Sequence, residues 1–292
     1  MTAPQRRRTR MIVVTGATGH LGRLVVAGLK EKVPADQIVA AVRSPEKAAD
    51  LGVTVRKADY NDPSSLAAAL EGADKVLLIS GSEVGKRVPQ HTAVVEAAKQ
   101  AGVSLLVYTS APKADTSPLI LAPEHKATEE AIRAAGLPYT ILRNGWYNEN
   151  YEQTVQQAVQ TGGFIGSAGE GRTASAARAD YAAAAVAVLT GEGHENKIYE
   201  LSGDVAWTRA ELAETIAQVA GKPVTYTDLT PEQHKAALLE AGLPEGTAGF
   251  VVALDGNTKD GLLGEVTSDL HDLIGRPTTP IADTVAEIVK SL

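Results

Sequence analysis

A glycine-rich turn between a predicted strand and a predicted helix constrains the fold of this chain more than any other stretch. The turn is Val14-Thr-Gly-Ala-Thr-Gly-His-Leu-Gly22, and its glycines follow a Gly-x-x-Gly-x-x-Gly spacing. Met11–Thr15, before it, is rich in β-branched residues, and Leu21–Leu29, after it, has the apolar period of a helix. Between a strand and a helix the motif predicts a dinucleotide site. The same glycines without these flanking elements would indicate only a tight turn.

Each glycine of the turn has a separate task if a dinucleotide binds. Gly16 allows the sharp turn off the strand, Gly19 lets the backbone approach a pyrophosphate, and Gly22 lets the helix pack close to the strand. The free amides at the helix start would face the phosphates. The predicted phosphate-binding residues are Gly16, Thr18, Gly19, His20, Leu21 and Gly22.

The rest of the first half alternates between short β-branched runs and amphipathic segments. This alternation predicts parallel strands joined by helices, and the unbroken apolar run Val76–Ile79 indicates a strand buried on both faces. We therefore expect an α/β protein with a doubly wound parallel sheet. The predicted strands are Met11–Thr15, Ile38–Val42, Val53–Lys57, Lys75–Ser80, Ser104–Thr109 and Tyr139–Asn144.

After Trp146 the pattern changes to mixed helices and strands around a glycine-rich patch, Thr161–Arg172. We expect a nucleotide-binding domain over residues 11–150 and a smaller C-terminal α/β lobe over 151–292, with chain segments partly interleaved and a ligand in the crevice between them. Residues 1–10 carry four arginines and are expected to be a disordered basic tail.

Composition excludes several classes of function. The 292 residues carry a net charge of −7 with no basic face beyond the tail, so we expect no nucleic-acid partner. The longest apolar run, Tyr181–Leu189, is too short to span a bilayer, so we expect no membrane insertion. The chain has no cysteine, which fits a cytoplasmic protein, and its six histidines show no metal-ligand spacing, so no metal is expected.

The carboxyl ends of the predicted strands supply the remaining cofactor candidates, because open sheets bind ligands there. Arg43 stands where an NAD site would have a carboxylate, so it favours NADP(H) by clamping a 2′-phosphate; the alternative is a solvated surface arginine. Asp59 could bind the adenine amine, or only start a turn. Later strand ends add Ser80, Gly81, Ser82, Thr109, Ser110 and Asn144.

These motifs resemble the NmrA-like group of atypical short-chain dehydrogenases, and within it the NADPH-dependent quinone oxidoreductases of the QOR2 type and the triphenylmethane reductases. The matching stretches are Val14–Gly22, Val42–Lys47, Leu77–Gln90, Tyr108–Ser110, Ala114–Pro118, Gly136–Tyr151, Ala174–Tyr181, Gly191–Glu200 and Gly275–Pro280. The resemblance implies a Rossmann-like sheet, NADPH at the glycine turn, and two-electron reduction of a small quinone-like substrate without flavin.

The chain departs from typical short-chain dehydrogenases in its acid–base residues. Those enzymes use a Ser with a Tyr-x-x-x-Lys helix; Ser110 fits the first position, but Leu121 and His125 stand at the other two. Hydride addition to a quinone gives a phenolate-type anion of pKa about 10, so water or a neutral amide such as that of Asn144 could suffice. His125 could donate a proton or hydrogen-bond the nicotinamide ribose, or be an exposed histidine on a helix surface.

The predicted catalytic residues are therefore Ser110, His125, Asn144 and Tyr147, with Tyr147 and Tyr151 offering a flat wall for a ring. Two alternatives stay open: a non-catalytic NADP(H)-binding redox sensor of the NmrA type, and a reductase of another conjugated substrate such as an imine or a triphenylmethane dye. A homodimer also stays open on the sequence.

Overall fold

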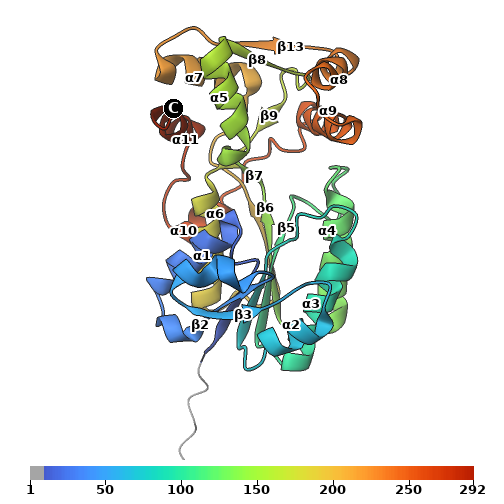
Figure 1. The fold of residues 1–292 in the computed structure, drawn as a ribbon, viewed down its shortest axis with the longest axis vertical. Coiled ribbons are helices and arrows are strands. Elements are labelled where there is room, and N and C mark those ends of the chain that lie inside the picture. The colour runs from blue at the N-terminus through green and yellow to red at the C-terminus, as the bar shows by residue number, and fades with distance from the viewer. Residues whose placement is uncertain (1–9) are drawn as a thin grey trace, which may run out of the picture. The chain divides into compact units, whose positions relative to one another are not determined.

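The computed structural model describes residues 10–292 (Figure 1). Of the predicted basic tail, residues 1–9 lie outside the described residues, and only Arg10 lies within them. Within this described part of the chain, no helix is long and apolar enough to cross a membrane.

The chain forms two compact units whose segments interleave in sequence. The first unit contains the described residues up to Ser110 together with Glu124–Leu142 and Ala182–Tyr199. The second unit contains Ala111–Pro123, Arg143–Tyr181 and Glu200–Leu292. The chain therefore leaves the first unit and returns to it twice. Residues 143–150, which we expected in the first domain, lie in the second unit.

A seven-stranded sheet in the order β11-β6-β5-β4-β1-β2-β3 organises the first unit. The pairs of β1 with β2 and β4, of β2 with β3 and of β4 with β5 are parallel, with Ile12 opposite Ile38 in the first of them. The strands are β1 Ile12–Thr15, β2 Ile38–Val42, β3 Thr54–Lys57, β4 Lys75–Leu78, β5 Leu105–Ser110, β6 Tyr139–Asn144 and β11 Lys197–Leu201.

This sheet confirms the predicted Rossmann-like fold. The chain runs outward through β2 and β3 and then returns to β4 on the other side of β1, which makes a switch point between β1 and β4. A crevice outside the carboxyl ends of the strands at such a point is where open α/β sheets bind ligands. The glycine turn follows β1 directly and therefore lies at this point.

Helices cover both faces of the sheet. Figure 1 shows α2, α3 and α4 on one face and α1 and α6 on the other. Buried apolar residues of the strands, such as Val76 and Leu106, pack with Leu66 of α2, Val94 of α3 and Ile132 of α4. The helices are α1 His20–Lys30, α2 Pro63–Ala69, α3 Arg87–Ala101, α4 Ala122–Ala135 and α6 Arg178–Thr190.

The second unit has its own apolar core, in which Val155 of α5, Ile216 of α7 and Val285 of α11 are buried together. Strand β8, Gly163–Gly166, pairs in parallel with β13, Thr225–Asp228. Its helices are α5 Glu152–Thr161, α7 Arg209–Ala220, α8 Pro231–Glu240, α9 Glu245–Lys259, α10 Asp269–Ile274 and α11 Ile281–Lys290. Short strands are β7 Trp146–Tyr147, β9 Arg172–Thr173, β10 Ser175–Ala176 and β12 Trp207–Thr208.

Two elements of this unit differ from the sequence prediction. Helix α5 was not predicted because only three of its ten residues, Val155, Ala158 and Val159, are apolar, although they stand at helical spacing. Strand β8 lies within the glycine-rich patch, and glycine is depleted in strands. Gly163 is needed there because a Cβ would lie 2.7 Å from the Thr225 carbonyl oxygen.

A buried carboxylate fastens the C-terminal segment of the second unit. Asp180, at the start of α6, is fully buried and accepts hydrogen bonds from the Arg276 guanidinium at 2.6 Å and the Thr279 amide at 2.7 Å. Charged acceptors form the stronger class of protein hydrogen bonds. Asp180 therefore fixes the segment that leads into α11.

We expect Asp180→Ala to lower the free energy of unfolding by about 2 kcal/mol, because the Thr279 amide loses a charged acceptor. Urea unfolding of the variant measures the effect. Asp180→Asn, which keeps an acceptor oxygen, should lose less. An Asp180→Ala protein as stable as the wild type would contradict this role.

Candidate functional site

The first unit contains a cavity of about 370 Å³ at the carboxyl ends of β1, β2, β3 and β4. Its position at the switch point of the sheet is the one that the glycine turn predicted. The lining residues are Gly16, Thr18, Gly19, Arg43, Ser44, Lys47, Ala58, Asp59, Tyr60, Asn61, Ile79, Ser80, Gly81, Ser82, Glu83 and Gln90.

The glycine turn has the geometry of a phosphate cradle. Gly16 has a φ of +61°, a conformation that other residues rarely adopt. A Cβ on Gly22 would lie 2.4 Å from the Gly16 carbonyl oxygen and 2.7 Å from the Ala17 Cα, so only glycine lets α1 start this close to the turn. Gly19 is the N-cap of α1 and no side chain caps that end, which leaves first-turn amides for an anion.

Not all of the residues predicted at this turn face the cavity. Gly16, Thr18 and Gly19 line it, whereas His20, Leu21 and Gly22 do not. Leu21 is buried in the core and His20 is exposed. The reason is helical geometry: these residues belong to the first turn of α1, where successive side chains point in different directions.

Positive and polar groups gather at the end of the cavity formed by β2 and β3. Arg43, Ser44 and Lys47 follow β2, and Asp59 follows β3. The Asp59 carboxylate accepts a hydrogen bond from the backbone amide of Asn61 at 2.9 Å and another from the Asn61 side-chain nitrogen at 3.2 Å. This holds Asp59 in a fixed orientation at the cavity wall.

Arg43 has an anionic neighbour on the opposite wall. Its Nη1 lies 3.5 Å from Glu83 Oε1, and the same carboxylate lies 3.3 Å from the Lys86 ammonium. Exposed pairs of this kind contribute little to stability, because water screens both charges. Arg43 is thus directed across the cavity and is not buried in a structural ion pair.

The segment that follows β4 is held by side chains from three other parts of the chain. The Ile79 amide donates to Thr15 Oγ1, the Ile79 carbonyl accepts from Tyr60, and the Ser80 amide donates to Thr109 Oγ1. Burial raises the pKa of Tyr60 to about 12, so it stays a phenol donor. Thr109, predicted to touch the cofactor, therefore acts through the Ser80 backbone and does not line the cavity.

Two predicted catalytic residues of the first unit are buried and engaged. Ser110 Oγ donates to the buried Glu129 carboxylate at 2.7 Å. His125 is only 6% exposed and its Nδ1 lies 2.8 Å from the Tyr108 hydroxyl, so the alternative of an exposed surface histidine is wrong. Burial, with a smaller contribution from Arg87, lowers the pKa of His125 to about 3. The ring is therefore neutral near pH 7.

In the second unit, Asn144 and Tyr147 form a pair. The Asn144 side-chain nitrogen donates to the Tyr147 hydroxyl at 3.1 Å, while Asn144 Oδ1 is buried with no hydrogen-bond partner among the described residues. The Tyr147 ring packs edge-on against Tyr181 and beneath the Arg178 guanidinium. Buried acceptors without a partner are rare, so this oxygen is a candidate ligand contact.

Tyr151, the other predicted ring wall, belongs to the core of the second unit. It is 7% exposed, stacks edge-on with Trp207 and accepts a hydrogen bond from Arg209 at 2.8 Å. Its role in the structure is packing.

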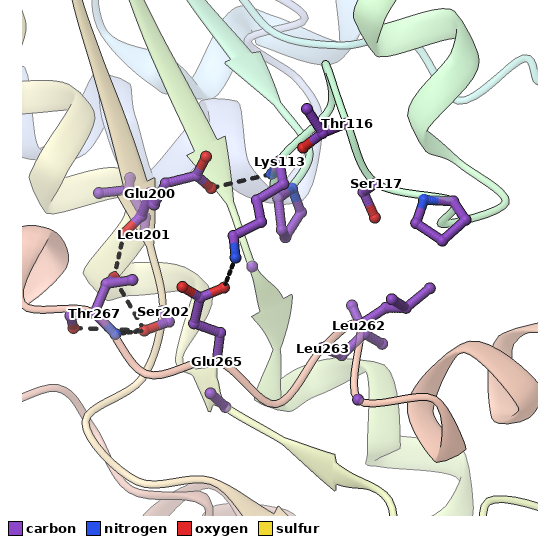
Figure 2. A pocket seen from close by; sticks show the side chains of 15 residues that line it. Lys113, Thr116, Ser117, Glu200, Leu201, Ser202, Leu262, Leu263, Glu265 and Thr267 are labelled. Carbon is purple, nitrogen blue, oxygen red and sulfur yellow. Dashed lines mark hydrogen bonds and ion pairs between the residues drawn. The ribbon is translucent and has the colours of Figure 1, made fainter.

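The second unit also has a cavity of its own, of about 230 Å³. Figure 2 shows Lys113 at its wall, with its amide bonded to Glu200 and its ammonium paired with Glu265. Leu262, Leu263 and two prolines form its apolar part. None of the predicted site residues lines this cavity.

Sequence reasoning missed several residues that face or support the first cavity. Lys47, Tyr60, Asn61 and Gln90 line it, and His91 supports it from α3. Lys47 lies in a 3₁₀ helix four residues beyond Arg43 and ends the matching stretch Val42–Lys47, and Gln90 ends the stretch Leu77–Gln90. Tyr60, Asn61 and His91 follow no motif. Among residues 10–292, no group of three or more metal-binding side chains lies close enough to hold an ion.

The residues of the first cavity fit a phosphorylated dinucleotide. The uncapped start of α1 suits a pyrophosphate, and Arg43 with Lys47 suits a further phosphate. The class of protein that this fold and site define is a dinucleotide-binding α/β protein of the Rossmann type.

The chain belongs to the NmrA-like family, whose model matches residues 8–267. It is 51% identical over 281 residues to quinone oxidoreductase 2 of Escherichia coli (strain K12), covering 95% of this chain and 98% of the relative. It is 34% identical to the NAD(P)H azoreductase of Xenophilus azovorans, covering 96% of this chain and 97% of that protein.

Solved structures agree with this assignment. The crystal structure of the E. coli quinone oxidoreductase QOR2 complexed with NADPH matches with a TM-score of 0.92 at 51% identity, covering 95% of this chain and 99% of that one. The triphenylmethane reductase of Citrobacter sp. matches with a TM-score of 0.92 at 42% identity, covering 96% and 99%. The predicted family and fold are thereby confirmed.

The two buried histidines of the first unit, His91 and His125, predict acid sensitivity. Burial lowers the pKa of each to about 3, below the value of about 6.5 in the unfolded chain. The unfolded state then binds more protons below pH 6.5, so stability falls as the pH drops from 6.5 towards 3. Between pH 7 and pH 5 each histidine should remove about 2 kcal/mol from the free energy of unfolding.

Denaturant unfolding of the wild type and His125→Phe at both pH values measures this effect. The variant should lose less stability than the wild type over the same interval. If both proteins lost the same amount, His125 would not be buried in its neutral form.

Proposed function

We propose that this chain is an NADPH-dependent quinone reductase that transfers a hydride to a quinone, or a similar conjugated acceptor, without flavin. One observation carries the proposal: a glycine-turn cavity with Arg43 and Lys47 at its far end, in a chain 51% identical to a quinone oxidoreductase whose structure is complexed with NADPH. The cavity alone would indicate only a nucleotide site, and the similarity to a quinone oxidoreductase supports the reaction.

Each group of cavity residues has a separate task in this proposal. Gly16, Thr18 and Gly19 hold the pyrophosphate, and Arg43 with Lys47 holds the 2′-phosphate. Asp59 accepts from the adenine amine. Ser80, Gly81 and Ser82 border the nicotinamide ribose, where small side chains leave room. NADPH, when bound, supplies the hydride.

The proton that completes the reduction does not need a strong acid from the protein. His125 is neutral near pH 7, and the Ser110 hydroxyl already donates a hydrogen bond to the Glu129 carboxylate. The phenolate-type product has a conjugate acid of pKa about 10, which water can protonate. We propose that Asn144 and Tyr147 orient the ring, because the Asn144 amide retains hydrogen-bonding capacity beyond its bond to Tyr147.

The direct test is consumption of NADPH on adding a simple benzoquinone, with a blank that lacks protein. The same assay with a triphenylmethane dye and an azo dye separates the quinone proposal from the neighbouring substrate classes. Binding of NADPH without turnover of any acceptor would contradict the enzyme proposal and favour a redox sensor.

Two narrower proposals concern the setting of the enzyme. The absence of cysteine supports a reducing cytoplasm, where disulfides are not maintained. A homodimer stays a prediction, which sedimentation of the purified protein would test.

We expect Arg43→Asp to weaken NADPH binding about 10- to 100-fold, since a hydrogen-bonded charge contact contributes roughly 1.5–3 kcal/mol. NADH, which lacks the 2′-phosphate, should be affected far less. Calorimetric dissociation constants for both cofactors measure the difference.

Lys32→Asp is the matched control, because Lys32 is exposed, undergoes the same charge change and does not line the cavity. It should leave both affinities nearly unchanged. Equal losses of NADPH and NADH affinity in Arg43→Asp would refute the phosphate clamp.

We expect His125→Ala to lower kcat/KM by less than the roughly 100-fold that loss of a general acid costs. Asn144→Ala should cost more, since it removes a group proposed to touch the reactants. Profiles of kcat/KM for one quinone over pH 6–9 measure both variants against the wild type. A loss above a thousandfold in His125→Ala, with a wild-type limb near pH 6.5 that the variant lacks, would identify His125 as the proton donor.

A further inference from the structure

Both backbone polar groups of Gly81 are bonded to side chains of one helix. The Gly81 amide donates to His91 Nε2 at 2.9 Å, and the Gly81 carbonyl accepts from Arg87 Nε at 2.6 Å. Arg87 and His91 both lie in the first turns of α3, four residues apart and therefore on one face. Gly81 itself lines the cavity of the first unit.

The direction of the hydrogen bonds fixes the tautomer of His91. Because Nε2 accepts from the Gly81 amide, the ring proton must be on Nδ1, which lies 2.9 Å from Thr128 Oγ1. The Thr128 hydroxyl in turn donates to the Glu124 carbonyl at 2.8 Å. The hydrogen bonds therefore run in one direction, from the Gly81 amide through His91 and Thr128 to the Glu124 carbonyl.

Packing leaves the ring no second position. His91 is fully buried and stands edge-on to Tyr108, with ring centroids 5.6 Å apart, and to Tyr60 at 6.3 Å. Burial keeps the ring neutral, since it lowers the pKa to about 3. Nε2 therefore remains a hydrogen-bond acceptor over the whole physiological pH range.

We propose that His91 is a positioning residue that fixes the Gly81 backbone for the nicotinamide half of the cofactor. Gly81 follows β4, which lies on the opposite side of β1 from β2 and its phosphate-binding Arg43. His91 thus acts through its hydrogen bond on the nicotinamide half of the proposed site, and its contact with the adenosine half is limited to packing against Tyr60. This inference rests on the NADPH-binding function proposed above.

His91→Phe is the informative variant, because it keeps an aromatic ring against Tyr60 and Tyr108 but leaves the Gly81 amide without an acceptor. We expect NADPH affinity to fall about tenfold or more, because the Gly81 backbone is no longer held in place and must be ordered when the cofactor binds. The affinity for 2′,5′-ADP, which has only the adenosine half, should change less than about twofold. In the free protein, hydrogen exchange at the Gly81 amide should accelerate.

Two further variants control for a general loss of structure. His91→Gln offers an amide oxygen to the Gly81 amide and should recover part of the NADPH affinity. Thr128→Val keeps the side-chain shape but removes the group that orients the ring, so it should give the same pattern with a smaller loss. These variants keep the test decisive if His91→Phe does not fold.

Equal losses of NADPH and 2′,5′-ADP affinity would overturn the proposal and reduce His91 to a packing residue. Faster exchange at Gly81 with unchanged NADPH affinity would overturn it as well. If the wild type bound neither ligand, the proposed function itself would fail, and the positioning role with it. Slow exchange at the Gly81 amide would then still establish the hydrogen bond, so the two failures are distinguishable.

Discussion

The close contact between the start of α1 and the glycine turn sets the geometry on which the rest of the first unit depends. A Cβ at Gly22 would lie 2.4 Å from a backbone oxygen that cannot move away, so this approach exists only because the residue is glycine. The contact aims the helix amides at the switch point of the sheet, where β1 and β4 part. The neighbouring strand ends then supply the walls of the cavity.

Those walls are fixed before any ligand arrives. The segment after β4 has no regular partner for its backbone, yet side chains of Thr15, Tyr60, Thr109, His91 and Arg87 bond its amides and carbonyls. Buried backbone groups need such partners, and here the requirement also orders a ligand-facing surface. The ordering entropy is lost on folding and not on binding, which favours affinity.

The sequence was sufficient for six of the seven strands of the sheet but only partly for the site; the seventh strand, Lys197–Leu201, falls in the segment expected to form a separate lobe. Strand ends such as Arg43, Asp59 and Gly81 could be assigned to the cavity because parallel strands end at one edge. The direction of a side chain at a strand end could not be predicted. Ser110 and Thr109 are adjacent in β5, yet one bonds Glu129 on α4 and the other the Ser80 amide. His91 follows no motif, because its partner lies ten residues earlier in a loop whose path only the fold determines.

The ion pair between Arg43 and Glu83 gives the cavity a counterion of its own. If Arg43 holds a phosphate as proposed, the Glu83 carboxylate competes for the same guanidinium. Arrival of the phosphate would then exchange one anion for another, and only the difference between the two attractions would contribute to affinity. Glu83 keeps Lys86 as a second cation, so the exchange leaves no charge without a partner.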